Sequence, residues 1–161
     1  MAVEVREALP EELGEAAEMM VAAYEEYRSQ VPPGLWDGYE RSIRDLRSRL
    51  PESRLILALE DGKMAGAVTY YPPDEARHAH IRLLAVPPEF RGKGLARILM
   101  NECLSRAREE GSTAIGLHTT TMMAIARAMY ERMGFVRDPE QDMEVAPGVT
   151  VMAYRLELGV S

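Results

Sequence analysis

The chain has 161 residues, of which 47% are hydrophobic and 28% charged, and this composition is typical of one globular domain with a sizeable core. Its formal net charge of −7 at pH 7 argues against a nucleic-acid partner, which would need a basic face. Because no apolar run approaches the roughly 20 residues of a membrane span and the N-terminal stretch has no signal-peptide pattern, we expect no membrane association and a cytoplasmic location.

Hydrophobic periodicity, glycine and proline predict alternating strands and helices along the chain. Asp61-Gly62 is typical of a hairpin turn, and Gly111 and Gly134 are typical helix ends. From the element order we predict an α/β sandwich with a partly antiparallel sheet, forming one domain over residues 1–161. We expect strands over residues 3–8, 54–59, 64–71, 77–86, 113–119, 135–136 and 149–158, and helices over 9–28, 37–50, 94–110 and 122–133.

A short glycine-rich, cationic loop, Arg91-Gly92-Lys93-Gly94, joins the strand over 77–86 to the helix over 94–110. Glycine lets the backbone approach a ligand, and the first N–H groups of a helix have no partner within it. With two cationic side chains beside them, these groups predict a site for a phosphate or pyrophosphate carried by a larger molecule. The loop is not a Walker loop, because no hydroxyl residue follows Gly92-Lys93, and Arg97 replaces the third glycine of a dinucleotide-binding loop.

The spacing Arg91-x-x-Gly94-x-Ala96 resembles the pyrophosphate-binding motif of the GCN5-related N-acetyltransferase (GNAT) family. A second stretch, Met123-x-x-Ala126-x-x-x-Tyr130-x-x-x-Gly-Phe, resembles a further motif of that family, in which an asparagine usually stands where this chain has Met123. Two motifs at the expected separation are far more specific than either motif alone.

The resemblance extends from about residue 3 to residue 158 and implies the fold and the cofactor of that family. The fold would be a mixed, mostly antiparallel sheet of about six or seven strands, flanked by about four helices and splayed after the fourth strand. The cofactor would be acetyl-CoA, with its pantetheine arm in the splay. The residues that the resemblance assigns to acetyl-CoA are Leu84, Ala85, Val86, Arg91, Gly92, Lys93, Gly94, Leu95, Ala96, Met123 and Ala126.

Acetylation of an amine requires removal of a proton from the amine, stabilisation of the thioester oxygen and release of the sulfur. The resemblance places Tyr130 beside the sulfur, where its hydroxyl can protonate the departing thiolate. It also places His80 where many family members have a glutamate base, acting directly or through a water. A histidine suits proton removal near neutral pH.

Other assignments remain open from the sequence. His118 is the alternative base, and Glu25 or Glu26 is a weaker one. By period-two alternation His80 and Arg82 share one face of their strand, and a bulge could change which residues face the cleft.

Four aromatic residues and one cysteine lie outside the two motifs. Tyr24, Tyr27, Trp36 and Tyr39 either pack the first two helices or form the wall of an acceptor site. Cys103 has the spacing of a core residue, and no cluster has the spacing of metal ligands.

We therefore predict an acetyl-CoA-dependent N-acetyltransferase that moves an acetyl group directly to a primary amine of a small molecule. A domain that binds acyl-CoA without catalysis, or an enzyme that acetylates a protein or peptide, is the alternative. Members of the family often dimerise, so a homodimer is among the expected partners. The sequence does not identify the acceptor amine or the acyl chain length.

Overall fold

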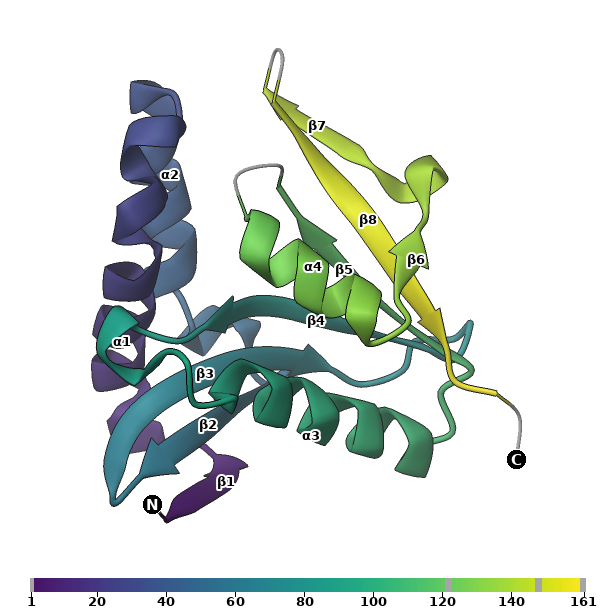
Figure 1. Cartoon of the computed structure of the whole chain (residues 1–161), viewed down its shortest axis with the longest axis horizontal. Coiled ribbons are helices and arrows are strands. Elements are labelled where there is room, and N and C mark those ends of the chain that lie inside the picture. The colour runs from purple at the N-terminus through teal and green to yellow at the C-terminus, as the bar shows by residue number, and fades with distance from the viewer. Residues whose placement is uncertain (1, 121–122, 147–148, 160–161) are drawn as a thin grey trace.

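The computed structural model describes residues 2–120, 123–146 and 149–159, which form eight strands and four α-helices (Figure 1). Short 3-10 turns flank several helices, as at residues 10–12, 25–30, 47–49 and 88–90. The strands are β1 (Val3–Glu7), β2 (Arg54–Glu60), β3 (Lys63–Tyr71), β4 (His78–Ala85), β5 (Ala114–Thr119), β6 (Val136–Arg137), β7 (Met143–Ala146) and β8 (Val149–Glu157), and the helices are α1 (Leu13–Tyr24), α2 (Pro33–Arg44), α3 (Leu95–Glu109) and α4 (Ala124–Arg132).

The strands form one mixed sheet in the order β1-β2-β3-β4-β5-β8-β6, and β7 pairs with β8 beside this path. Every pair is antiparallel except β4–β5, which is parallel. The predicted α/β class and the mixed, mostly antiparallel sheet are therefore confirmed. The β2–β3 hairpin turns at Asp61-Gly62, where both residues have positive φ, as the Asp-Gly pair predicts.

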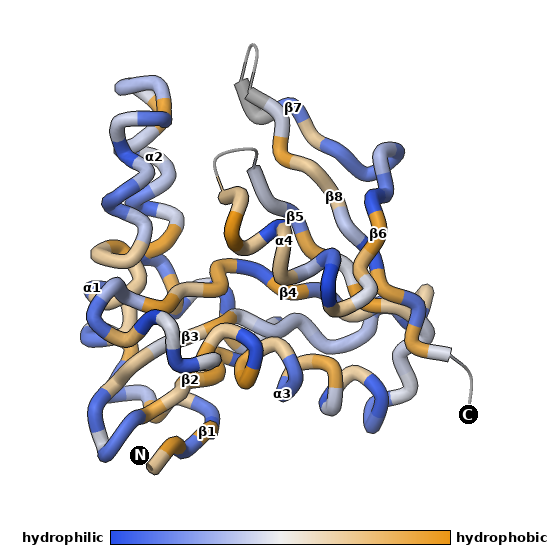
Figure 2. Tube along the Cα trace, in the orientation of Figure 1, coloured by the Kyte–Doolittle hydropathy of each residue, from blue (hydrophilic) through white to orange (hydrophobic). Residues whose placement is uncertain are grey.

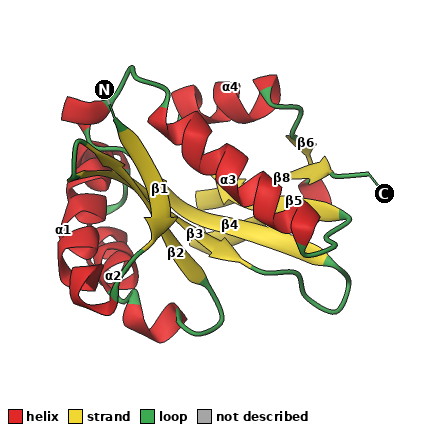
Figure 3. Cartoon of the chain, turned by 90° about the horizontal axis from the view of Figure 1, so that it is seen from below, coloured by secondary structure: helices red, strands yellow, loops and turns green. Residues whose placement is uncertain are grey.

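The helices cover the two faces of the sheet and bury a hydrophobic cluster on each (Figure 3). Ile56 and Ala58 of β2 face the cluster under α3, whereas Leu55, Leu57 and Leu59 face α1 and α2. This alternation is what a strand buried on both faces requires. Figure 2 shows that α2 is largely hydrophilic, and its buried side chains are Trp36 and Ile43.

Some expected boundaries were wrong. The second helix begins at Pro33 rather than at residue 37, because proline is well suited to the first helical turn, where its missing N–H has no partner to lose. It ends at Arg44, and residues 47–49 form a separate 3-10 turn. The expected first helix has α-helical geometry only over α1. β7 was not predicted, and Met122 lies outside the described residues.

The parallel β4–β5 pairing ends at Ile81 and Leu117, so the last residues of β4 continue without β5 beside them. The glycine loop follows directly and leads into α3 (Figure 1). The fold thus brings the end of a partly unpaired strand, a glycine loop and a helix N-terminus together. Within the described residues, no helix is both long enough and apolar enough to cross a membrane.

Candidate active site

The glycine loop exposes its backbone. Gly92 and Gly94 have φ values of 81° and 82°, and a Cβ built at either position would meet no atom within 4 Å. Gly94 is the N-cap of α3, without a side-chain cap. Arg91 and Ile98 donate their amides to carbonyls at Pro88 and Gly94, but the amides of residues 92–97 have no acceptor among the described residues. Open space over a row of unpaired amides at a helix N-terminus fits a phosphate group.

Both cationic side chains of the loop have partners within the protein. Arg91 forms an ion pair with Glu26 at 2.8 Å, and its Nε donates to the carbonyl of Val86 at 2.8 Å. The hydrogen bond from Arg91 lowers the pKa of Glu26. Lys93 Nζ lies 2.9 Å from Glu60 Oε1. Because carboxylates balance both charges, the attraction for a phosphate lies chiefly in the backbone amides, and Arg91 holds the loop against α1 and β4.

A β-bulge interrupts β4 next to the loop. Thr69 of β3 is opposite Arg82, but Ala67 is opposite Ala85, so two residues of β4 occupy the place of one. Leu83, in the bulge, has a positive φ of 56°, which is uncommon for a residue other than glycine.

The bulge changes which side chains face each helix layer. Ala79 and Ile81 belong to the cluster under α3, and after the bulge Leu84 packs against that cluster. Leu83 and Ala85 face the cluster under α1 and α2. Regular alternation would have placed Leu83 and Ile81 on the same face.

Two backbone carbonyls of the predicted pantetheine contacts accept hydrogen bonds from side chains. The hydroxyl of Tyr24, on α1, donates to the carbonyl of Leu84 at 2.6 Å. Arg91 donates to the carbonyl of Val86. These donors fix the orientation of peptide groups on both sides of Ala85. The role of Tyr24 has no signal in the sequence, because Tyr24 lies 60 residues from its partner.

Tyr130, the predicted acid, is 6% exposed and lies on α4. Its ring packs against Phe135 and Tyr154, at centroid distances of 6.0 and 6.4 Å. Its hydroxyl has no hydrogen-bond partner among the described residues. Burial raises the pKa of Tyr130, and the nearby phenols of Tyr27 and Tyr39 raise it further. The side chain therefore keeps its proton near neutral pH and has it available to donate.

His80, the predicted base, lies on the α2 side of β4, and its side chain is 45% exposed. Its Nε2 is 3.5 Å from Asp74, and a Cβ at the neighbouring Gly116 would lie 3.4 Å from its Nδ1. Gly116 thus leaves room for the imidazole ring. The backbone amide of His78 and the side chain of His80 hold the pKa of Asp74 below its ordinary value.

The alternative bases have other contacts. His118 Nε2 is 2.9 Å from the carbonyl of Gln141, and since a carbonyl only accepts, this nitrogen carries the proton. Glu25 pairs with Arg28, and Glu26 pairs with Arg91. The hydrogen bond from Arg91 lowers the pKa of Glu26 and so weakens it as a base.

The motif around α4 is divided between the two sides of the sheet. Ala126 packs against the cluster under α3, together with Tyr130. Met123 precedes α4 as its N-cap and packs against the cluster under α1 and α2. The Thr119 hydroxyl donates to its sulfur, with 3.6 Å between oxygen and sulfur. The expected helix over residues 122–133 thus begins only at Ala124, and Met123 does not share a helix face with Ala126 and Tyr130.

The aromatic residues of the first two helices form one cluster. Tyr24 contacts Tyr27 and Tyr39 at centroid distances of 6.3 and 5.8 Å, and Tyr39 contacts Trp36 at 5.9 Å. Tyr24 and Trp36 are buried and fill the core, whereas Tyr27 and Tyr39 are partly exposed. Burial raises the pKa of Tyr39 to about 12. The packing role is thus confirmed for Tyr24 and Trp36, and a role of Tyr27 and Tyr39 in the wall of an acceptor site stays a prediction.

Cys103 packs in the core, and burial raises the pKa of its thiol to about 12. In the described part of the chain, no three His, Cys, Asp or Glu side chains are grouped so as to hold a metal ion.

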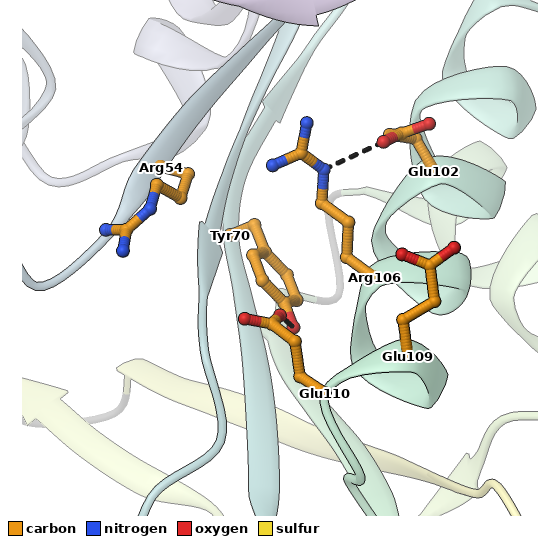
Figure 4. A pocket seen from close by; sticks show the side chains of 6 residues that line it. All are labelled: Arg54, Tyr70, Glu102, Arg106, Glu109 and Glu110. Carbon is orange, nitrogen blue, oxygen red and sulfur yellow. Dashed lines mark hydrogen bonds and ion pairs between the residues drawn. The ribbon is translucent and has the colours of Figure 1, made fainter.

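A cavity of about 310 Å³ lies near the end of α3, far from the glycine loop (Figure 4). Its lining residues are Arg54, Tyr70, Glu102, Arg106, Glu109 and Glu110.

That cavity is distinct from the glycine loop in both place and chemistry. Arg106 pairs with Glu102 at 2.7 Å, and the Tyr70 hydroxyl donates to Glu110. With three glutamates in its lining, the cavity does not suit a phosphate group.

Comparisons with known proteins agree with this geometry. A sequence profile described as the acetyltransferase (GNAT) family matches residues 16–135. N-acetylaspartate synthetase from Rattus norvegicus is 33% identical over 107 residues, which are 66% of this chain and 36% of that protein. Streptothricin acetyltransferase from Streptomyces lavendulae is 38% identical over 87 residues, 52% of this chain and 45% of that protein. The chain thus spans about a third of the length of the first relative and under half of the second.

A solved structure shows the same fold. The crystal structure of PaiA N-acetyltransferase from Thermoplasma acidophilum in complex with coenzyme A has a TM-score of 0.81 at 16% identity, covering 98% of this chain and 99% of that chain. The glycine loop, the unpaired end of β4, the shared fold and the matching profile lead to one conclusion: this chain belongs to the acetyltransferase (GNAT) family, whose cofactor is acetyl-CoA.

Proposed function

We propose that this chain is an N-acetyltransferase that moves an acetyl group directly to a primary amine of a small molecule, in the cytoplasm. The observation that carries the proposal is the row of unpaired amides at residues 92–97, next to the unpaired end of β4. Two relatives are named for small molecules, N-acetylaspartate and streptothricin, and this supports a small acceptor.

We assign the cofactor site to the loop and the strand before it. The amides of Gly92, Lys93, Gly94, Leu95 and Ala96 bind the pyrophosphate, and Arg91 orients the loop through Glu26 and Val86. The backbone of Leu84, Ala85 and Val86 lies along the pantetheine arm, with Ala126 and Met123 on the opposite side. Bound acetyl-CoA supplies an acetyl group that is already activated as a thioester.

The proton transfers are assigned to two side chains. His80 takes a proton from the amine, directly or through a water, because only the neutral amine has a lone pair for attack. Asp74 lies 3.5 Å from the Nε2 of His80 and orients the imidazole ring. Tyr130 holds a proton on its hydroxyl near neutral pH and donates it to the leaving sulfur.

The proposal is tested by measuring thiol release from acetyl-CoA with a panel of amines, from neutral to mildly alkaline pH. The panel contains amino acids, polyamines, aromatic amines, aminoglycosides and short peptides. Release that depends on one class of small amine supports the proposal. Release with peptides alone identifies a protein acceptor. Protein that binds acetyl-CoA but is inactive with every amine points to a non-catalytic acyl-CoA-binding domain. Either of the last two results rejects the small-molecule assignment.

A further inference from the structure

We propose that Arg82 binds a carboxylate of the acceptor, so that the preferred amine carries a carboxylate one or two carbons from its amino group, as an amino acid does. The inference rests on the proposed function and narrows it, because it names a substrate class that excludes simple polyamines. It rests on three observations: the position of Arg82 on β4, the lack of a carboxylate paired with it among the described residues, and a second arginine, Arg49, on the same tyrosine.

Arg82 occupies the mouth of the splay between β4 and β5. It is the first residue of β4 beyond Ile81, whose pairing with Leu117 is the last between the two strands. Arg82 is exposed, while Ile81 is buried under α3. By alternation, Arg82 therefore shares the face of His80, and it lies two residues from Leu84, whose backbone is assigned to the pantetheine arm.

The guanidinium of Arg82 has no ion-pair partner among the described residues. No carboxylate of the described residues lies within 4.0 Å of it, unlike Arg91, which pairs with Glu26. Arg82 instead lies over the ring of Tyr71, 5.5 Å from its centroid. This contact orients the guanidinium without using its hydrogen-bond donors.

A second arginine adds positive charge to the same place. Arg49 donates to the Tyr71 hydroxyl at 3.1 Å, so Tyr71 contacts one guanidinium through its hydroxyl and that of Arg82 through its ring face. The Nε of Arg49 is buried without an acceptor among the described residues. Asp74, near the start of β4, lies 3.5 Å from His80 and forms no ion pair with Arg82. The surroundings of Arg82 therefore favour an anion.

The spacing suits an amino acid. Residues two apart on one strand are about 6.6 Å apart, so His80 can contact the amino group while Arg82 contacts the carboxylate of the same molecule. A guanidinium binds a carboxylate through two parallel hydrogen bonds and gives both charge and orientation. A polyamine would instead bring a second ammonium group towards Arg82 and would be repelled.

The test compares amino acids with the amines that decarboxylation gives from them, such as leucine with 3-methylbutylamine, tyrosine with tyramine and lysine with cadaverine. For the wild type we expect kcat/KM to favour the carboxylated member by about 10- to 100-fold, the range for a hydrogen bond to a charged group. Arg82→Ala should reduce this preference to about one, chiefly by raising KM for the amino acid. KM for acetyl-CoA should be unchanged, and Arg82→Lys should keep part of the preference.

Two controls separate the inference from misfolding and from failure of the proposed function. Turnover of the decarboxylated amine by Arg82→Ala shows that the variant is folded and active. Arg108→Ala removes an exposed positive charge from α3, on the opposite face of the sheet, and should keep the wild-type preference. Equal use of both members by the wild type, or an unchanged preference in Arg82→Ala, would overturn the inference while leaving the acetyltransferase intact. Inactivity with every small amine would overturn the proposed function itself.

Discussion

Tyr130 combines two properties that rarely occur together in a protein core. Its ring is enclosed by Phe135 and Tyr154, yet its hydroxyl has no partner among the described residues. The hydroxyls of two other core tyrosines are bonded: Tyr24 donates to Leu84, and Tyr70 donates to Glu110. The Tyr130 hydroxyl is also not among the described side-chain atoms that are buried without a partner, so it keeps some exposed surface and is open to a ligand.

Tyr130→Phe should lower kcat by about 10- to 100-fold, towards the weak end of general acid catalysis, because a thiolate with a conjugate-acid pKa of about 8.5 leaves readily without help. KM for acetyl-CoA should hardly change, and steady-state kinetics measures both constants. Tyr70→Phe is the matched control, since it removes a buried hydroxyl at the far end of α3 and should lower thermal stability while keeping kcat. An unchanged kcat in Tyr130→Phe would remove this residue from the mechanism.

At the scale of elements, the site is defined by contacts between segments that are distant in sequence. Tyr24 at the end of α1 bonds to the end of β4, and Glu26 in the 3-10 turn that follows α1 bonds to the glycine loop. β2 reaches the same loop through Glu60 and Lys93. The loop therefore has a fixed conformation before any ligand binds, which reduces the entropy lost on binding.

Gly94→Glu should abolish acetyl-CoA binding, because it places a carboxylate and a side chain over the unpaired amides at the start of α3. The matched control is Gly62→Glu in the β2–β3 turn. Gly62 also has a φ of 82° and open space around a built Cβ, so the backbone strain is the same in both variants. Isothermal titration with acetyl-CoA should detect binding to Gly62→Glu and none to Gly94→Glu. Binding to Gly94→Glu with wild-type affinity would show that the phosphate lies elsewhere.

Tyr24→Phe should lower the free energy of unfolding by about 0.5–1.5 kcal/mol, the usual contribution of one hydrogen bond, and should weaken acetyl-CoA binding several-fold. The carbonyl of Leu84 would lose its donor, and the bulge of β4 would lose a contact that orients it. Urea unfolding and titration with acetyl-CoA measure the two effects. Tyr39→Phe is the control, because no described residue bonds to its hydroxyl. A loss of stability as large in Tyr39→Phe would mean that the Tyr24 hydrogen bond is not the cause.

At the scale of the whole molecule, two arginine–carboxylate pairs link the outer strands to the rest of the fold. Arg6 of β1 forms two hydrogen bonds to Glu12 before α1, at 2.8 and 3.0 Å. Asp142 accepts from Arg137 and from the backbone amide of Ala153 on β8. The hydrogen bonds lower the pKa of Glu12 from 4.5 to about 2 and that of Asp142 from 3.8 to about 2.

These shifts set an acid limit on stability. A carboxylate whose pKa is lower in the folded state stabilises the fold above its unfolded pKa, and this contribution is lost as the pH falls through the folded pKa. We expect the free energy of unfolding to fall between about pH 4.5 and pH 2. Denaturant unfolding at several pH values measures this dependence. The free energy of unfolding should change less steeply with pH in the double variant Glu12→Gln with Asp142→Asn than in the wild type. Glu15→Gln, a change at an exposed carboxylate, should leave the slope as it is; equal slopes in all three proteins would contradict the assignment.

Most of the fold and the outline of the site could be predicted from the sequence, because they depend on local signals. Gly94 at the start of α3 and the Asp-Gly turn of the hairpin follow from backbone preferences within a few residues. The positive φ of Leu83 has no such signal, since leucine gives no indication of a left-handed conformation. The partner of Arg91 could not be predicted either, because Glu26 lies 65 residues away and only the tertiary fold brings them together.

The bulge of β4 affects both the packing of this strand and the backbone groups that it offers to a ligand. If a single residue were deleted at Leu83, Thr69 and Ala67 would still be opposite Arg82 and Ala85 in an uninterrupted ladder, and Ala85 and Val86 would keep the faces they have now. The remaining residues of β4 would keep their faces, and a left-handed residue that costs about 1–2 kcal/mol would be gone, together with the contact that Leu83 makes with the cluster under α1 and α2. The strand register itself therefore does not require the extra peptide unit. What the extra unit changes is the direction of the backbone groups next to the glycine loop, so the length of this strand sets what it offers a ligand.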